Sequence, residues 1–213
     1  MNEAFNKLPD GKKSAILKAA YNEFEENGFK RASTNKIAAK ARIGKGTLFY
    51  YFGNKKKLYQ YLITTSFNIA YDEYLMQINF DKTDYFDRLE SITDLKQKVS
   101  NLYPNELSFL SKLLLTPDDM EWSDVIQEKR EESEKVWEKV LTENIDFSKF
   151  REDLPREKVL NLIKWGLEGY RKELEQKANS LGNSTVFSEE EIKYYYQEYN
   201  DYIDLLKRTY YKS

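Results

Sequence analysis

The spacing of apolar residues constrains the fold of this chain more than any other feature of its sequence. Between the prolines, apolar side chains recur at every third or fourth position and not at every second one. This spacing gathers them on one face of an α-helix, whereas a half-buried β-strand requires alternation. Only 8 of the 213 residues are glycine and 4 are proline, so few positions interrupt a helix. The sequence therefore predicts an all-α protein.

We expect about nine helices. In the first of them, Glu23 falls on the same face as the apolar Ala20 and Phe24, and Gly28 is suited to end the helix. The predicted helices span residues 12–27, 33–40, 45–52, 55–79, 83–102, 105–115, 119–144, 156–180 and 188–211.

The composition excludes several classes of function. The chain has no cysteine and no histidine, which excludes disulfides, thiolate metal sites, a serine triad, a zinc hydrolase and a His-ligated haem. Carboxylate pairs such as Asp118–Asp119 and Glu131–Glu132 are better explained as solvated helix ends and faces than as catalytic pairs. We therefore expect no enzyme, no metal and no cofactor.

The same sequence indicates where the protein resides. It contains no apolar run near the roughly 20 residues that a membrane span requires, and the first seven residues do not form an apolar signal segment. We expect a cytoplasmic protein without a membrane partner.

Charge divides the chain into two parts. Residues 1–60 contain 13 Lys and Arg against 5 Asp and Glu, a net charge of +8, whereas residues 61–213 contain 21 against 31, a net charge of −10. A small basic segment joined to a larger acidic one suggests a module that binds a polyanion, followed by a body that would repel it. Taken alone, the basic segment is equally well explained as a solvated surface.

Two short helices separated by a tight turn form the sharpest motif. They are predicted over residues 33–40 and 45–52, and they are typical of a helix-turn-helix, whose second helix lies in the major groove of DNA. Ser33 is suited to cap the first of them, and Asn54 is suited to cap the long helix that follows the second.

The second short helix begins with residues suited to DNA. Gly46 and Thr47 are small and allow close approach, and Lys45 can reach a phosphate or a guanine edge. Tyr50 and Tyr51 can each donate a hydroxyl hydrogen bond to a phosphate oxygen.

Basic residues are dense around this motif. Lys55 begins the next helix, where the helix dipole and the side chain both attract an anion. If six such charges each met a phosphate, the affinity would fall with salt at a log-log slope of about −5. The alternative is that the aromatic run 49–52 belongs to the core and rim of the domain. Seven cations lie within 22 residues: Lys36, Lys40, Arg42, Lys45, Lys55, Lys56 and Lys57.

The segment 12–61 closely resembles the DNA-binding domain of the TetR family of bacterial transcriptional regulators. The resemblance covers about 50 residues and is carried by Ile16-Leu17-x-Ala19-Ala20-x-x-x-Phe24-x-x-x-Gly28-Phe29, Ser33-Thr34-x-x-Ile37-Ala38, Lys45-Gly46-Thr47-Leu48-Phe49-Tyr50-Tyr51-Phe52 and Asn54-Lys55-x-x-Leu58.

This resemblance implies a domain organisation and a site. It implies a helix-turn-helix domain over residues 1–54, a helical effector-binding and dimerisation domain over residues 55–213, and a homodimer on a near-palindromic double-stranded DNA operator. The implied DNA contacts are Ser33, Thr34, Lys45, Thr47, Tyr50, Tyr51 and Lys55, to which we add Lys36 and Gly46 for their charge and size.

Three positions depart from the pattern of the family. Arg42 stands where a glycine is usual in the turn, so either the arginine adopts a left-handed conformation at a cost of about 1 kcal/mol or the turn is built differently. Gly44 replaces the usual Ser or Thr cap and thus removes one hydroxyl, and Phe49 replaces a common tyrosine.

The last two predicted helices are rich in aromatic residues. Their apolar surface exceeds what one neighbouring helix covers, which favours a four-helix bundle with a second copy of the chain. The alternative is an ordinary core within one chain. The predicted dimer interface comprises Ile163, Leu167, Tyr170, Tyr195, Tyr199, Tyr202, Ile203 and Leu206.

Aromatic residues on the central helices suggest an apolar ligand pocket, although each of them is also a normal core residue. We predict a pocket formed by Tyr103, Phe109, Trp122, Trp137 and Trp165, with Lys164 or Glu168 as a polar anchor. The resulting hypothesis is a dimeric repressor that a small organic ligand releases from its operator. In the alternative hypothesis, the helical body docks a protein partner instead of a small molecule.

Overall fold

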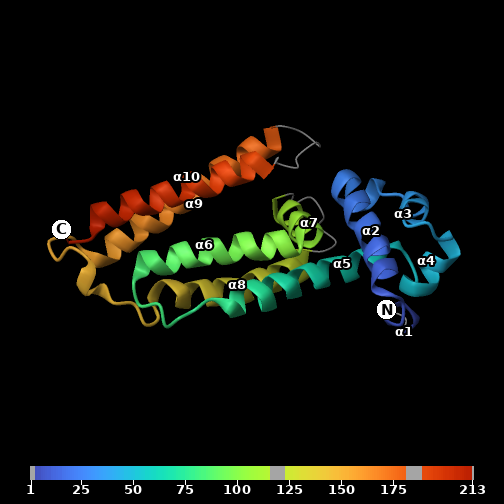
Figure 1. Cartoon of the computed structure of the whole chain (residues 1–213), viewed down its shortest axis with the longest axis horizontal. Coiled ribbons are helices and arrows are strands. Elements are labelled where there is room, and N and C mark those ends of the chain that lie inside the picture. The colour runs from blue at the N-terminus through green and yellow to red at the C-terminus, as the bar shows by residue number, and fades with distance from the viewer. Residues whose placement is uncertain (1–2, 116–122, 181–188, 213) are drawn as a thin grey trace. The chain divides into compact units, whose positions relative to one another are not determined.

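The computed structural model describes residues 3–115, 123–180 and 189–212 (Figure 1). Within these ranges the chain forms ten α-helices and no strand, as the periodicity predicted. An isolated antiparallel bridge joins Phe150 to Tyr211. In the part of the chain that is described, no helix combines the length and the apolar character needed to cross a bilayer.

The chain divides into two compact units. The N-terminal unit comprises residues Met1–Gln77 and Lys98–Lys135, and the C-terminal unit comprises Ile78–Gln97 and Val136–Ser213. The N-terminal unit extends beyond the predicted DNA-binding domain 1–54, and the domain boundary between residues 54 and 55 stays a prediction.

The N-terminal unit is built around one long helix. This helix, α2 (Asp10–Arg31), packs against α3 (Thr34–Lys40), α5 (Lys55–Ile69) and α7 (Pro104–Leu115). Figure 1 shows α3 and α4 (Lys45–Phe52) following one another beside it. Its core contains the fully buried side chains of Ile16, Tyr21, Ile37, Leu48 and Leu62. The unit also contains α1 (Glu3–Asn6), the end of α6 (Tyr85–Leu102) and the first part of α8 (Ser123–Thr142).

Two parts of this unit differ from the prediction. The regular α-helix that begins at Lys55 ends at Ile69 and continues as a π-helical turn over Ala70–Tyr74 and a 3-10 turn over Leu75–Gln77, not as one helix to residue 79. Neither glycine nor proline marks this change, and a three-to-four spacing does not distinguish the wider π turn from an α turn. The other difference is α1, which is too short to produce a periodic pattern.

Local chemistry explains the ends of these helices. The Ser33 side chain accepts a hydrogen bond from the Lys36 N–H, and the Asn54 side chain accepts one from the Lys57 N–H. Both predicted caps are therefore present, and they satisfy N–H groups that have no partner within the helix. Gly28 has φ 64° and ψ 173° and interrupts the regular backbone of α2 near the predicted end.

The turn between α3 and α4 is built on a left-handed arginine. Arg42 has φ 55°, which selects the first of the two alternatives for this position and costs about 1 kcal/mol. The Ile43 N–H donates to the Ala38 carbonyl at 3.0 Å and closes the turn. Gly44 caps α4 without a side-chain hydrogen bond, so the missing hydroxyl is a real loss for this helix.

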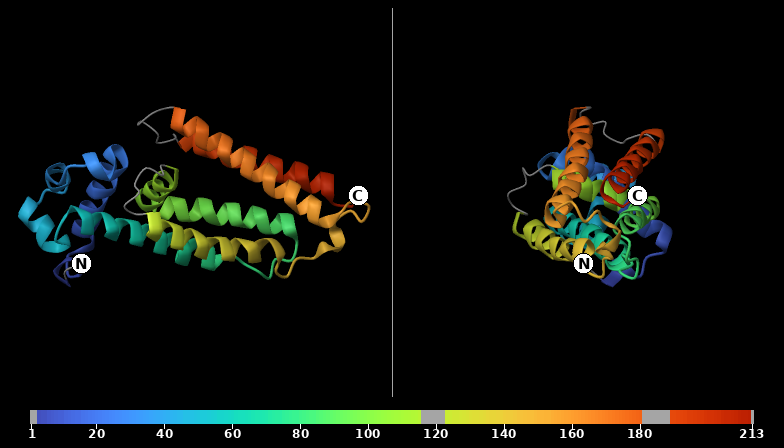
Figure 2. Two further views of the ribbon diagram at one scale, coloured as in Figure 1. Left: turned by 180° about the vertical axis from the view of Figure 1, so that it is seen from behind. Right: turned by 90° about the vertical axis from the view of Figure 1, so that its left-hand side faces the viewer.

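The C-terminal unit packs around the first part of α6 (Tyr85–Leu102) and the end of α8 (Ser123–Thr142). Two further helices, α9 (Arg156–Ser180) and α10 (Glu189–Tyr210), run side by side in opposite directions, as Figures 1 and 2 show. The buried core comprises Tyr85, Phe86, Leu89, Phe150, Val159, Ile163 and Ile203.

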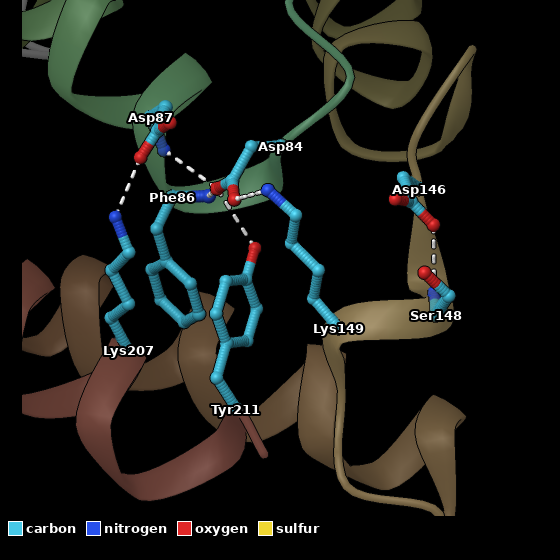
Figure 3. A network of polar contacts seen from close by, with 8 residues as sticks. All are labelled: Asp84, Phe86, Asp87, Asp146, Ser148, Lys149, Lys207 and Tyr211. Atoms are coloured by element: carbon cyan, nitrogen blue, oxygen red, sulfur yellow. Dashed lines mark hydrogen bonds and ion pairs between the residues drawn. The ribbon is translucent and has the colours of Figure 1, made fainter. Parts of the chain in front are cut away.

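A polar network ties the start of α6 to the C-terminal end of the chain (Figure 3). One oxygen of Asp84 accepts hydrogen bonds from the Phe86 N–H at 3.0 Å and the Tyr211 hydroxyl at 2.9 Å, and its other oxygen pairs with Lys149 at 2.8 Å. Burial alone would raise the pKa of Asp84, but the hydrogen bonds from Lys149, the Asp87 N–H and Tyr211 hold that pKa below its ordinary value.

The buried side chain of Arg88 holds the end of α8 in the same unit. Its guanidinium donates to the carbonyls of Val140 at 3.0 Å, Glu143 at 2.7 Å and Asn144 at 3.2 Å. These carbonyls lie at and just beyond the end of the helix, where they have no intrahelical donor. Arg88 therefore closes this helix end and binds it to α6.

Candidate nucleic-acid interface

The predicted recognition helix α4 has one buried face and one open face. Leu48 and Phe52 point into the core, at 0% and 3% exposure, whereas Tyr50 on the opposite side is 62% exposed. Of the predicted DNA contacts, Lys36, Lys45, Gly46 and Tyr50 are exposed, and Ser33, Thr34, Thr47, Tyr51 and Lys55 are half-buried.

The open face of α4 leaves room for a close approach. A Cβ atom added at Gly46 would meet no atom within 4 Å, so internal packing does not require a glycine there. The ammonium of Lys45 lies 5.7 Å from the centre of the Phe49 ring and remains on the open side. This face therefore combines a cation, a small residue and a phenol at the start and middle of one helix.

The cations around the motif are not equivalent. Lys55 is directed by two contacts, a hydrogen bond from its ammonium to the Lys30 carbonyl at 3.2 Å and a position 5.1 Å from the centre of the Phe29 ring. Lys40 is one of the cations for which we predicted phosphate contact. Its ammonium lies 4.0 Å from a Glu23 oxygen and 3.8 Å from a Glu26 oxygen. Two carboxylates thus occupy the surroundings of Lys40.

Helix α1 packs against the recognition helix, and the sequence pattern did not predict it. Phe5 is 1% exposed, and its ring centre lies 5.7 Å from that of Tyr51, 4.8 Å from that of Phe52 and 6.2 Å from that of Tyr61. The signal was the apolar spacing of Ala4, Phe5 and Leu8 ahead of Pro9, which one turn of helix is too short to make conspicuous.

The predicted pocket residues are distributed over both units. Phe109 is buried in the N-terminal unit with its ring centre 5.3 Å from that of Tyr21, and Tyr103 is half-buried in the same unit. In the C-terminal unit, Trp137 is half-buried. Trp122 lies outside the described residues.

The remaining pocket residues lie on α9. Lys164 forms an ion pair with Glu168 at 3.9 Å, and Trp165 between them is 62% exposed. The structure therefore brings these two charged residues together on one turn of helix. The pocket itself stays a prediction.

The predicted dimer residues on α9 and α10 differ in how far they are buried within the single chain. Ile163 and Ile203 are fully buried and Tyr170 is 7% exposed, so the single chain already uses these three side chains as core. Leu167, Tyr195, Tyr199 and Leu206 are half-buried. Among the predicted set only Tyr202 is exposed, and the other large apolar side chains described as protruding from these helices are Leu162, Trp165, Tyr194 and Leu205.

Comparison with known proteins agrees with this geometry. Residues 16–62 match the family model of bacterial regulatory proteins, tetR family. An uncharacterized HTH-type transcriptional regulator, YhgD of Bacillus subtilis, is 37% identical over 54 residues, which are 25% of this chain and 28% of that protein. The sequence match to this relative is thus confined to about a quarter of its length.

Solved structures extend the likeness of the fold to the whole chain. A TetR family transcriptional regulator from Chloroflexus aurantiacus has a TM-score of 0.65 at 22% identity, with 100% of this chain and 99% of that chain covered. The ketosteroid transcriptional regulator KstR2 of Mycobacterium tuberculosis has a TM-score of 0.63 at 16% identity, with 97% and 98% covered. The fatty acid degradation regulator FadR of Bacillus halodurans has a TM-score of 0.56 at 20% identity, with 89% and 96% covered.

All of these proteins are described as regulators and not as enzymes. At such low identity the structural likeness concerns the fold alone, so the assignment depends on residues 16–62 and on the arrangement of α3 and α4 that they form. Residues 16–62 of this chain therefore match the DNA-binding domain of the tetR family of bacterial regulatory proteins, and the chain as a whole has the fold of TetR family regulators.

Proposed function

We propose that this protein is a homodimeric DNA-binding repressor that a small organic ligand releases from a near-palindromic operator. The observation that carries the proposal is the open face of α4, where Lys45, Gly46 and Tyr50 are exposed while Leu48 and Phe52 fix the helix in the core. A helix held in this way presents base-reading and phosphate-binding groups on a rigid support.

Net charge supports the same assignment. The excess of +8 in residues 1–60 attracts the phosphate backbone, and the excess of −10 in the remainder opposes any contact of that part with DNA. DNA is therefore drawn to the segment that contains α3 and α4.

The proposed dimer uses the apolar side chains that protrude from α9 and α10. Leu162 and Trp165 share one face of α9 with Gly166 and Gly169, and a Cβ added at either glycine would meet nothing within 4 Å. A helix from a second copy can approach closely at such a face, and an exposed tryptophan beside it is a typical anchor of an interface. Two copies then present two recognition helices to half-sites about 34 to 36 Å apart.

The nature of the ligand is proposed from the body and from its structural neighbours. The absence of cysteine and histidine disfavours a metal or thiol sensor. One structural neighbour is described as a ketosteroid transcriptional regulator and another as a fatty acid degradation regulator, and we propose an apolar organic effector of that general kind for this chain. Helix α5 follows α4 after two residues and is the proposed route by which ligand binding reaches the recognition helix. A difference in affinity of about 1 to 3 kcal/mol between two states is enough for such a switch.

Selection from a random duplex pool tests the DNA-binding part. The purified protein should enrich a near-palindromic sequence and bind it as a dimer, and members of a library of apolar metabolites should release it. Enrichment without release by any compound would contradict the small-molecule part of the proposal and favour the alternative in which the body docks a protein partner. Failure to enrich any duplex would contradict the proposal.

A further inference from the structure

The most unusual buried group of the N-terminal unit is the carboxylate of Glu23. This side chain is 1% exposed and lies on the face of α2 that carries the buried residues Ala20 and Phe24. A buried carboxylate is costly unless hydrogen bonds and nearby cations compensate for the lost water. Its presence in an otherwise apolar face therefore requires an account.

The two oxygens of Glu23 have different surroundings. Oε1 accepts a hydrogen bond from the Ser33 N–H at 2.9 Å and another from the Asn27 side-chain amide at 3.2 Å. Oε2 is buried and accepts no hydrogen bond from the residues that the structure describes. The ammonium of Lys40 lies 4.0 Å from Oε2.

These contacts place one side chain against both ends of α3. Ser33 is the N-terminal cap of this helix and Lys40 is its last residue. The helix has seven residues and buries only Ile37 and Ala38, so its own apolar contacts are few. A carboxylate that attracts both ends is well suited to fix its rotation and translation on α2.

We infer that Glu23 is a positioning residue for DNA recognition, which sets α3 and, through the four-residue turn, the recognition helix α4. The inference rests on the proposed DNA-binding function. Base contacts require their groups to be held within about 0.5 Å of the productive geometry, and α3 is joined to α4 through hydrogen bonds such as Ile43 N–H to the Ala38 carbonyl. An error in the placement of α3 is therefore passed on to Lys45 and Tyr50.

Three variants separate this role from a general effect on stability. Glu23→Ala removes both contacts, whereas Glu23→Gln keeps an oxygen that accepts from Ser33 and has nearly the same volume. Glu26→Ala is the matched control, because Glu26 also faces Lys40, at 3.8 Å, but is 59% exposed.

Affinity for the selected operator and for random duplex is measured on folded protein at low temperature. We expect Glu23→Ala to lower affinity for the operator at least about tenfold, since a hydrogen bond to a charged group is lost, and to leave affinity for random duplex nearly unchanged. Glu23→Gln and Glu26→Ala should stay within about threefold of the wild type, in keeping with retained or peripheral contacts. An equal fall on both duplexes, or no fall on the operator, would overturn the inference. Should Glu23→Ala not fold, Glu23→Asp, which withdraws the carboxylate by one methylene, is held to the same expectations.

Amide hydrogen exchange without DNA tests independently whether Glu23 holds the N-terminal end of α3. The Ser33 amide should exchange at least about tenfold faster in Glu23→Ala than in the wild type, and the Leu62 amide in α5 should not change, because opening is local. Equal exchange rates of the Ser33 amide in Glu23→Ala and in the wild type would show that Glu23 does not hold α3, even if the protein binds DNA. If the wild-type protein binds no duplex, the proposed function fails and with it the role in recognition, while exchange at Ser33 still decides whether Glu23 holds α3.

Discussion

Truncation of Phe5 to alanine measures how strongly α1 supports the recognition helix. The Phe5 ring is 1% exposed and contacts the rings of Tyr51, Phe52 and Tyr61. Burial of about 150 Å² of aromatic surface at about 25 cal/mol per Å² corresponds to about 4 kcal/mol. This value is close to the loss seen on core truncations of phenylalanine, about 3 to 5 kcal/mol.

The observed loss should be smaller than this value. Because α1 has only four residues and Phe5 is the only one of them that is buried, it can detach in the variant and recover backbone entropy of about 1 kcal/mol per residue. We therefore expect Phe5→Ala to lower the free energy of unfolding by about 2 kcal/mol, between full loss and full compensation.

Denaturant unfolding of the two variants Phe5→Ala and Asn6→Ala provides the comparison. Asn6 lies on the same helix and is exposed, so its truncation should change stability by less than about 0.5 kcal/mol. Deletion of residues 1–8 should lower the free energy of unfolding by the same amount as Phe5→Ala if the Phe5 ring accounts for the packing of α1. A change below about 0.5 kcal/mol in Phe5→Ala would contradict the expected loss of about 2 kcal/mol, because it would be no larger than the change on truncation of an exposed residue.

Three further results are expected. The log-log salt slope of duplex binding is about −5 for six phosphate contacts, and Lys45→Ala should reduce its magnitude by about 1. Lys40→Ala should leave the slope unchanged, because two carboxylates lie near Lys40, and equal effects of the two variants would contradict this distinction. Asp84→Asn should destabilise the protein near neutral pH. Because the pKa of Asp84 is lowered in the folded protein, its stabilising contribution is present above the ordinary carboxyl pKa and is lost as the pH falls through the lowered pKa. The free energies of unfolding of the variant and the wild type should therefore converge in acid, and a difference that grows in acid would contradict this prediction. Trp165→Glu should convert a dimer into a monomer in sedimentation experiments, since it places a charge on the proposed apolar interface, and an intact dimer would exclude this face.

Short-range chemistry explains what the sequence could predict. Ser33 and Asn54 cap the helices for which they were proposed, because a cap depends only on a side chain and on backbone two or three positions away. The same is true of the interruption at Gly28 and of the limits of α4, which runs from Lys45 to Phe52 as predicted.

Contacts between residues that are far apart in the sequence could not be predicted from it. Helices α9 and α10 carry apolar residues on more than one side, and periodicity does not tell which side meets the same chain. Ile163 proved to be fully buried within the chain, whereas Trp165, two positions later, is largely exposed. Likewise, Glu23 was visible on the apolar face of α2, but its hydrogen bond to Ser33, ten residues away, depends on the packing of α3.

A titration with duplex DNA shows whether α3 and α4 bind double-stranded DNA. The wild-type protein and a variant with both Lys45→Ala and Tyr50→Ala are titrated against the selected duplex at low ionic strength, with fluorescence anisotropy as the signal. The expected result is saturable binding of two chains per duplex and a loss of affinity of at least about tenfold in the variant, because base and phosphate contacts are removed. A wild-type protein that remains monomeric and does not bind the duplex would contradict it.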